Sequence, residues 1–140
     1  MDTAMDSWRQ FRATPDSSDT RSHLSGSDAE ALACRYLETQ GLKLIQRNFR
    51  TRRGEIDLIM QDHQTLVVVE VRFRRSERFG SAEESITPQK CGRLTAAALA
   101  YMQRQHYNND TVARFDAVAI KPDSSSDSGF ALNWVRHILG

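Results

Sequence analysis

The chain has 140 residues, which is enough for one domain with a hydrophobic core, and its net charge of +1 does not by itself indicate a nucleic acid partner. No apolar run approaches the roughly 20 residues of a membrane span, and the polar N-terminus lacks the apolar core of a signal peptide, so we expect a cytoplasmic protein. Two isolated cysteines, Cys34 and Cys91, argue against a disulfide framework or a structural zinc site.

The N-terminal residues are predicted to be a disordered tail, and residues 26–140 are predicted to form a single domain. Residues 1–25 are rich in Ser, Thr, Asp and Arg and contain few apolar residues, which is typical of disorder.

A first helix is predicted over about residues 28–40. Ser27-Asp28-Ala29-Glu30 has the spacing of a helix capping box, an apolar stripe follows it, and Gly41 ends the helix. Capping alone explains a glutamate at position 30. In a second interpretation, the Glu30 carboxylate reaches from the flank of the apolar stripe to the edge of whatever the helix packs against.

After a first strand over residues 42–50 and a turn, two strands over residues 54–73 form the centre of the predicted fold. Alternating apolar and polar residues and a Val-rich run mark these two strands. A turn centred between residues 63 and 64 places Asp57 opposite Glu70.

Two carboxylates that face each other across a hairpin repel, because such side chains are close neighbours. A divalent cation that bridges Asp57 and Glu70 compensates this repulsion, and hard cations such as Mg²⁺ bind carboxylates in this way. The alternative is a solvated strand face. In that case Glu55, which the same register places opposite Arg72, forms an ordinary cross-strand ion pair with it.

Basic residues gather on both sides of this hairpin. Residues 43–53 contain five Lys and Arg residues and no acid, and residues 72–78 contain four Arg residues and one Glu. Positive patches beside a carboxylate pair suit a phosphate backbone, although arginines can also keep strand edges from aggregating. The residues expected to contact nucleic acid are Arg50, Arg52, Arg53, Arg74, Arg75 and Arg78.

The rest of the chain predicts a loop, a second helix and two further strands. The expected elements are a loop over residues 74–86, a helix over 87–106, a strand over 112–120, a loop over 122–129 and an edge strand over 130–139. Thr87 as N-cap and Pro88 at the first helical position begin the helix. Lys90 lies in its first turn, which is an unfavourable place for a cation, so it either has a specific task or points to solvent.

Several short stretches together carry a resemblance to a known family. They are Ala29-Glu30, Asn48-Phe49-Arg50, Gly54-Glu55-Ile56-Asp57-Leu58-Ile59, Val69-Glu70-Val71-Arg72, Phe79-Gly80, Ser85-Ile86, Lys90 and Arg114-Phe115-Asp116. This set resembles the YraN-type family, a widespread bacterial group expected to be endonuclease-like and distantly related to archaeal Holliday junction resolvases. The order of elements and acids also resembles the restriction-endonuclease-like superfamily, whose core motif is an Asp followed on the next strand by Glu-x-Lys.

The resemblance covers roughly residues 26–138 and implies an α/β fold with a mixed central β-sheet flanked by helices. It implies that Asp57 and Glu70 are ligands of Mg²⁺ or Mn²⁺ and that Glu30 is an additional acid near the metal. Arg72 stands where the superfamily usually has lysine. Because arginine stays protonated, it can position a phosphate but cannot deprotonate a water, and Lys90 is expected to supply the ammonium.

The expected function is metal-dependent hydrolysis of phosphodiester bonds in nucleic acid, with DNA, and branched DNA in particular, suggested by the family resemblance. The expected catalytic residues are Glu30, Asp57, Glu70, Arg72 and Lys90. The alternative is a non-catalytic nucleic-acid-binding or adaptor protein that retains the nuclease fold, a hypothesis best supported by Arg72. A homodimer is plausible because junction resolvases act on two-fold substrates.

Overall fold

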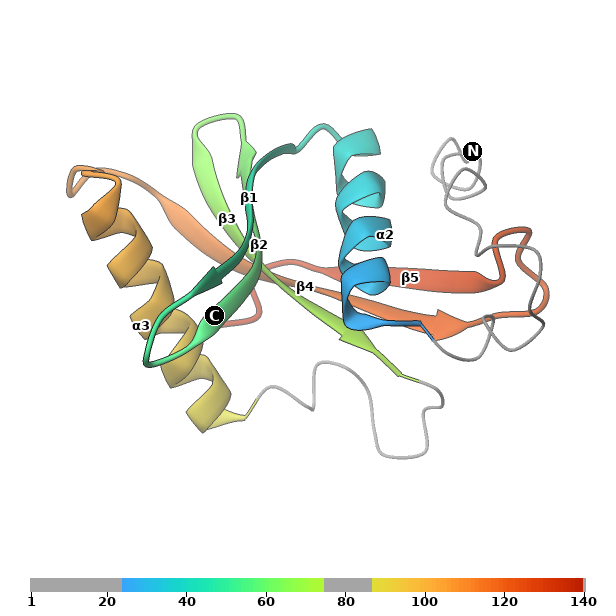
Figure 1. Cartoon of the computed structure of the whole chain (residues 1–140). Helices are drawn as coiled ribbons and strands as arrows, with labels where there is room; N and C mark the ends of the chain where they lie inside the picture. Colours follow the sequence, from blue (N-terminus) through green and yellow to red (C-terminus); the bar gives the residue numbers. More distant parts are fainter. Residues whose placement is uncertain (1–23, 75–86, 140) are drawn as a thin grey trace.

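The computed structural model describes residues 24–74 and 87–139, which form a five-stranded sheet with a helix on each face (Figure 1). The elements are α2 (Gly26–Thr39), β1 (Lys43–Arg50), β2 (Glu55–Asp62), β3 (Thr65–Phe73), α3 (Pro88–Arg104), β4 (Ala113–Pro122) and β5 (Phe130–Val135). Residues 1–23 of the predicted tail (1–25) and residues 75–86 of the predicted loop (74–86), including Arg75 and Arg78, lie outside the described residues.

The sheet is mixed, and its strands lie in chain order from β1 to β5. The first three strands are antiparallel neighbours, β4 is parallel to β3, and β5 is antiparallel to β4 at the far edge. The parallel pair needs a long connection, and α3 is part of that connection. The predicted α/β fold with a mixed central sheet and flanking helices is confirmed, with β3 in the centre.

The predicted register of the central hairpin is also confirmed. Asp62 pairs with Thr65 around a two-residue turn, and the ladder continues to its last pair, Leu58 with Val69. His63 in the turn has a φ of 56°, the left-handed conformation that tight hairpin turns need. One step beyond the last pair, the two strands carry Asp57 and Glu70.

The two helices cover opposite faces of the sheet and build two hydrophobic cores. The core under α2 includes Leu37, Leu58 and Val69, and the core under α3 includes Val68 and Tyr101. Because side chains alternate along a strand, Glu70 points to the α3 side of β3, as Val68 does. Within the described residues, no helix is long and apolar enough to cross a membrane.

The beginning of α2 differs from the prediction. Ser25 is the N-cap, and its side chain accepts a hydrogen bond from the Asp28 backbone N–H at 3.0 Å. The predicted cap at Ser27 is therefore wrong by two residues. Ser25 and Asp28 have the same capping-box spacing as Ser27 and Glu30, and Leu24, which packs against the core, places Ser25 at the cap.

The ends of the helices follow the expected local chemistry. Gly41 has a φ of 100°, and Leu42 donates its backbone N–H to the Leu37 carbonyl at 3.1 Å, which is the Schellman termination that favours glycine. Thr87 caps α3 by accepting a hydrogen bond from the Lys90 backbone N–H at 3.1 Å, and Pro88 occupies the first turn, as predicted.

The N-cap assignment predicts different effects for the two serines. Ser25→Ala removes the acceptor of the Asp28 N–H and should lower the free energy of unfolding by about 1 kcal/mol. Ser27→Ala is the matched control and should change it by no more than about 0.5 kcal/mol, because a surface substitution away from a cap costs little. Urea unfolding followed by circular dichroism measures both. A larger loss in the Ser27→Ala protein would contradict the assignment.

Candidate active site

Asp57 and Glu70 lie where the hydrogen-bonded ladder between β2 and β3 ends. Leu58 and Val69 form the last pair of that ladder. Directly beyond it, the Val71 backbone N–H donates a hydrogen bond to Asp57 Oδ2 at 2.8 Å. The Asp57 carboxylate is thus fixed against the backbone of β3, beside the residue that carries the second acid.

Two cations converge on the Glu70 carboxylate. The Glu70 side chain is only 4% exposed, and its Oε2 lies 3.1 Å from Lys90 Nζ and 3.2 Å from Arg72 Nε. A buried carboxylate is stable only when it is paired in this way. Lys90 therefore has a specific task in the first turn of α3, and the interpretation in which it merely points to solvent is wrong.

The Arg72 side chain is paired by charge without a full complement of hydrogen bonds. Its Nε is buried and, within the described part of the chain, donates no hydrogen bond, although Glu70 Oε2 is only 3.2 Å away. The contact is an ion pair whose angles do not suit a hydrogen bond. Arg72 is thus held beside Glu70 by charge.

The expected ion pair between Glu55 and Arg72 is wrong. Glu55 is instead the register partner of Arg50 in the ladder between β1 and β2, and Arg50 Nε lies 3.5 Å from Glu55 Oε2. The cross-strand pairing of β2 with β3 ends at Leu58, so it no longer sets what Glu55 faces. The solvated-face interpretation therefore loses the ion pair on which it depended.

Glu30 comes to the site from α2 and is held by an arginine on β1. Its side chain is 12% exposed, and its Oε1 lies 3.5 Å from Arg47 Nη2. The same Nη2 donates a hydrogen bond to the Ser27 carbonyl at 3.0 Å, so Arg47 links β1 to the first turn of α2. Since Ser25 caps the helix with Asp28, the capping role expected for Glu30 is wrong.

Arg47 is a residue that the sequence analysis grouped with the exposed basic cluster and did not assign to the site. Its pairing with Leu58, a core residue under α2, shows that its side chain lies on the α2 face of the sheet. The signal in the sequence was the alternation along residues 43–50. A bulge between Leu44 and Gln46 shifts the alternation of side chains between the two faces of β1, so the sequence pattern alone does not place Arg47 on the α2 face.

The environment of Asp57 is strongly unfavourable to its negative charge. Burial is the largest cause and the Glu70 charge is the next, and together they raise the pKa of Asp57 to about 7. The Val71 N–H lowers this pKa, whereas the charges of Glu30 and Glu55 raise it further. Three carboxylates, those of Glu70, Glu30 and Glu55, therefore repel the charge of Asp57, and a positive charge placed beside Asp57 would relieve that repulsion.

The donor chemistry of this position fits a hard divalent cation. Asp57 and Glu70 supply carboxylate oxygens, and Mg²⁺ commonly takes one or two protein carboxylates together with water and substrate phosphate oxygens. Over residues 24–74 and 87–139, no group of three or more His, Cys, Asp or Glu side chains is arranged to hold a metal. Among the described residues, Asp57 and Glu70 would hold the ion, with Glu30 as a further negative charge nearby.

An arginine-lined cavity of about 480 Å³ lies beside the acids, between the turn that joins β1 to β2 and the start of α3. Its lining residues are Arg50, Thr51, Arg52, Arg53, Gly54, Glu55, Lys90, Arg93 and Leu94. Lys90 lines this cavity and also contacts Glu70, so the cavity adjoins the carboxylate cluster. Arg93 was not among the predicted contacts, because helical periodicity alone does not show what its exposed face meets.

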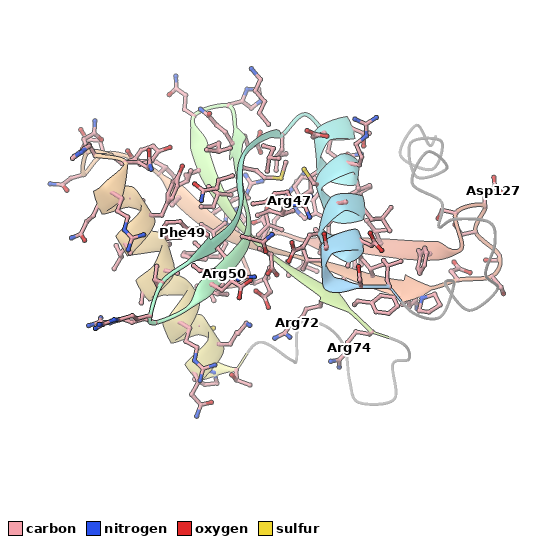
Figure 2. All side chains as sticks on the ribbon, viewed as in Figure 1. Arg47, Phe49, Arg50, Arg72, Arg74 and Asp127 are labelled. Atoms are coloured by element: carbon pink, nitrogen blue, oxygen red, sulfur yellow. The ribbon has the colours of Figure 1, made fainter. Side chains whose placement is uncertain are left out.

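Figure 2 shows Arg50 near the end of β1, and Arg72 and Arg74 at the C-terminal end of β3. Arg74 is half-buried, and its backbone N–H donates to the Ile120 carbonyl at 2.8 Å. Of the six arginines predicted to contact nucleic acid, Arg50, Arg52 and Arg53 line the cavity.

The motif Arg114-Phe115-Asp116 forms a separate network. Asp116 is fully buried and accepts hydrogen bonds from Trp134 Nε1 at 3.0 Å and from the His137 backbone N–H at 3.1 Å. Arg114 donates to Asp116 and to Asp62. These contacts hold the C-terminal segment against β4, so the motif is explained by folding.

The chain was compared with known protein families and curated proteins. Residues 29–120 match the profile of the Uncharacterised protein family UPF0102. The chain belongs to the UPF0102 family. A UPF0102 protein of Nitrosococcus oceani is 50% identical over 111 residues, which are 79% of this chain and 87% of that protein. One from Pseudomonas syringae pv. tomato is 43% identical over 114 residues, 80% of this chain and 89% of its own.

The family match confirms the resemblance to the YraN-type group. A UPF0102 protein of Herminiimonas arsenicoxydans is also 44% identical over 120 residues, which are 86% of this chain and 90% of that protein. The part of the chain that matches the UPF0102 profile includes the candidate acids, Lys90 and the arginine-lined cavity.

The raised pKa of Asp57 predicts how the stability of this UPF0102 protein depends on pH. In metal-free buffer, folded Asp57 keeps a proton that the unfolded chain loses near pH 4, so this contribution to stability is lost as the pH rises through about 7. Asp57→Asn keeps an acceptor for the Val71 N–H but cannot ionise. Between pH 4 and pH 8, the free energy of unfolding of the variant should therefore rise relative to that of the wild type by about 1–3 kcal/mol.

Urea unfolding at a series of pH values with a chelator measures this difference. Glu38→Gln, at an exposed acid on α2, is the control and should leave the slope of stability against pH unchanged. Parallel curves for the wild type and the Asp57→Asn protein between pH 4 and pH 8 would contradict the electrostatic picture of the site.

Proposed function

We propose that this chain is a metal-dependent nuclease that hydrolyses phosphodiester bonds in nucleic acid. The observation that carries this proposal is the meeting of Asp57 and Glu70, from adjacent strands, with Lys90 and Arg72 at the edge of an arginine-lined cavity. Acids that suit a divalent cation and cations that suit a phosphate are the two components that phosphodiester hydrolysis requires.

The order of these residues along the chain supports placement in the restriction-endonuclease-like superfamily. An acid on β2 and a Glu-x-Arg on β3 follow the superfamily pattern, with arginine in place of lysine, and α2 contributes the additional acid Glu30. Through this superfamily, branched DNA is the substrate suggested by analogy with junction resolvases.

In the proposed mechanism, Asp57 and Glu70 would hold a divalent cation, which would supply an activated water and a positive charge for the phosphate. Arg72 contributes a permanently charged guanidinium beside Glu70, and its charge attracts a phosphate. Lys90, which is 31% exposed and lines the cavity, binds a phosphate oxygen. Because Arg72 cannot give up its proton, it orients the phosphate and does not act as a base.

Glu30 and Arg47 have a supporting role in this proposal. Arg47 holds the Glu30 carboxylate between α2 and β1, where its charge acts on Asp57. The charge of Glu30 disfavours an uncompensated Asp57 carboxylate, so it attracts a cation to this position.

One observation favours the second candidate, a non-catalytic nucleic-acid-binding or adaptor protein. Lys90 and Arg72 both lie against Glu70 Oε2, so this carboxylate is already neutralised by the protein. A fold that had lost its metal would retain such a pairing as a stable ion cluster. The charge repulsion left at Asp57 argues for the nuclease, since the cluster leaves that acid uncompensated.

Cleavage assays distinguish the two candidates. With Mg²⁺ or Mn²⁺, we expect the wild type to cut labelled nucleic acid, tested as four-way junction, flap, duplex and single strand. Asp57→Asn/Glu70→Gln should cut at least about a hundredfold more slowly, because both carboxylates that hold the cation lose their charge.

Glu38→Gln is the matched control, since it removes an acid on the exposed face of α2 and should leave cleavage unchanged. If neither the wild type nor the double variant cuts any substrate, and both bind nucleic acid equally with a strong dependence on salt, the nuclease proposal fails and the binding protein is the better account.

A further inference from the structure

A second cavity lies on the other side of the turn that joins β1 to β2. It has a volume of about 770 Å³ and continues along α3 away from the acids. Its lining residues are Thr51, Arg52, Arg53, Gly92, Thr95, Ala96, Leu99, Ala100, Gln103 and Arg104. Thr51, Arg52 and Arg53 also line the first cavity. The turn that carries them therefore forms a basic ridge between the two cavities.

The ridge is fixed to α3 by a close backbone contact at Gly54. A Cβ atom at this position would lie only 2.6 Å from the Arg93 carbonyl oxygen. The turn itself is closed by Thr51, whose backbone N–H donates to the Gly54 carbonyl at 2.8 Å and whose hydroxyl accepts from the Gly54 N–H at 3.1 Å. The turn and the helix therefore hold their arginines in a defined arrangement.

Five arginines line the two cavities, and together we call them the arginine track. Its members are Arg50, Arg52, Arg53, Arg93 and Arg104. Glu55, which pairs with Arg50, is the acid among the described lining residues. The distance along α3 from Lys90, beside the acids, to Arg104 at the far end of the track is roughly 21 Å at the helical rise per residue. This length corresponds to about six base pairs of duplex.

The far end of the track is held in place by the core. The Arg104 guanidinium carbon lies 5.3 Å from the centre of the Phe49 ring, and Phe49 packs edge to face on Tyr101. A guanidinium fixed over an aromatic ring loses little freedom when it binds an anion.

We infer that the arginine track binds the sugar–phosphate backbone of a nucleic acid duplex and leads it to the carboxylate site at Lys90. The charge of the track is complementary to a regular polyanion, and its Thr and Gln side chains are further donors to phosphate oxygens. Proteins that grip single strands stack bases on aromatic side chains, and none of the described residues that line either cavity is aromatic. A duplex offers its backbone without its bases, which matches this lining.

This inference rests on the proposed function only where it says that the track leads the duplex to a site at which a phosphodiester bond is cut. The binding itself is tested on the full chain carrying Asp57→Asn/Glu70→Gln, with a chelator present, so that neither cleavage nor metal contributes. Fluorescence anisotropy with a labelled duplex longer than about ten base pairs covers the whole track.

The deciding variant adds Arg93→Gln/Arg104→Gln to that protein, because these two residues belong to the track but not to the acid cluster. The plot of log affinity against log salt should become shallower by about 2, and duplex binding should weaken at least about tenfold at 0.1 M salt. Arg35→Gln/Arg136→Gln is the matched control. It removes the same charge from two exposed arginines, Arg35 on α2 and Arg136 over the Trp134 ring, and should leave the slope unchanged.

Three outcomes of the binding assay would overturn the inference. Equal losses in the track variant and its control would show that only net charge matters. Displacement of the duplex by polyglutamate of equal charge, or equal affinity for a single strand, would show that the track fits another anionic partner. If the protein cuts nucleic acid but its binding does not depend on the track, this inference fails and the nuclease proposal stands. If binding depends on the track but nothing is cut, the nuclease proposal fails and this inference stands.

Discussion

The arrangement of the site depends on one electrostatic constraint, the burial of two carboxylates at the end of the hairpin ladder. Glu70 is buried and satisfied by Lys90 and Arg72, whereas Asp57 is left with a backbone hydrogen bond and the repulsion of its neighbours. A folded protein keeps such an unfavourable group when the surrounding structure holds it in place and a ligand relieves it. We propose a divalent cation as this ligand, because its charge and its preference for carboxylate oxygens meet both needs.

The fold supports this constraint from both faces of the sheet. On one face, α2 brings Glu30 to Arg47, and on the other, the capped first turn of α3 brings Lys90 to Glu70. The contact of Gly54 with α3 is equally consequential, because any larger residue would push the basic turn away from the helix. Acids, cations and arginines are thus held by separate elements around the same sheet.

Much of the fold could be predicted because local rules decide it. The two-residue turn at His63 sets the register that brings Asp57 and Glu70 together, and the Thr87-Pro88 start of α3 is fixed by capping chemistry. The contact between Glu30 and Arg47 could not be predicted, since it depends on a bulge in β1 and on a helix that begins two residues earlier than expected. The extension of the basic surface along α3 likewise follows from packing between elements distant in sequence.

Binding of Mn²⁺ to the isolated protein tests the central claim most directly, since it needs neither a substrate nor turnover. Titration followed by electron paramagnetic resonance should show saturable Mn²⁺ binding by the wild type and by the Glu38→Gln protein, and none by the Asp57→Asn/Glu70→Gln protein. Saturable binding that survives in the double variant, or its absence from the wild type, would contradict the assignment of Asp57 and Glu70 as the cation site.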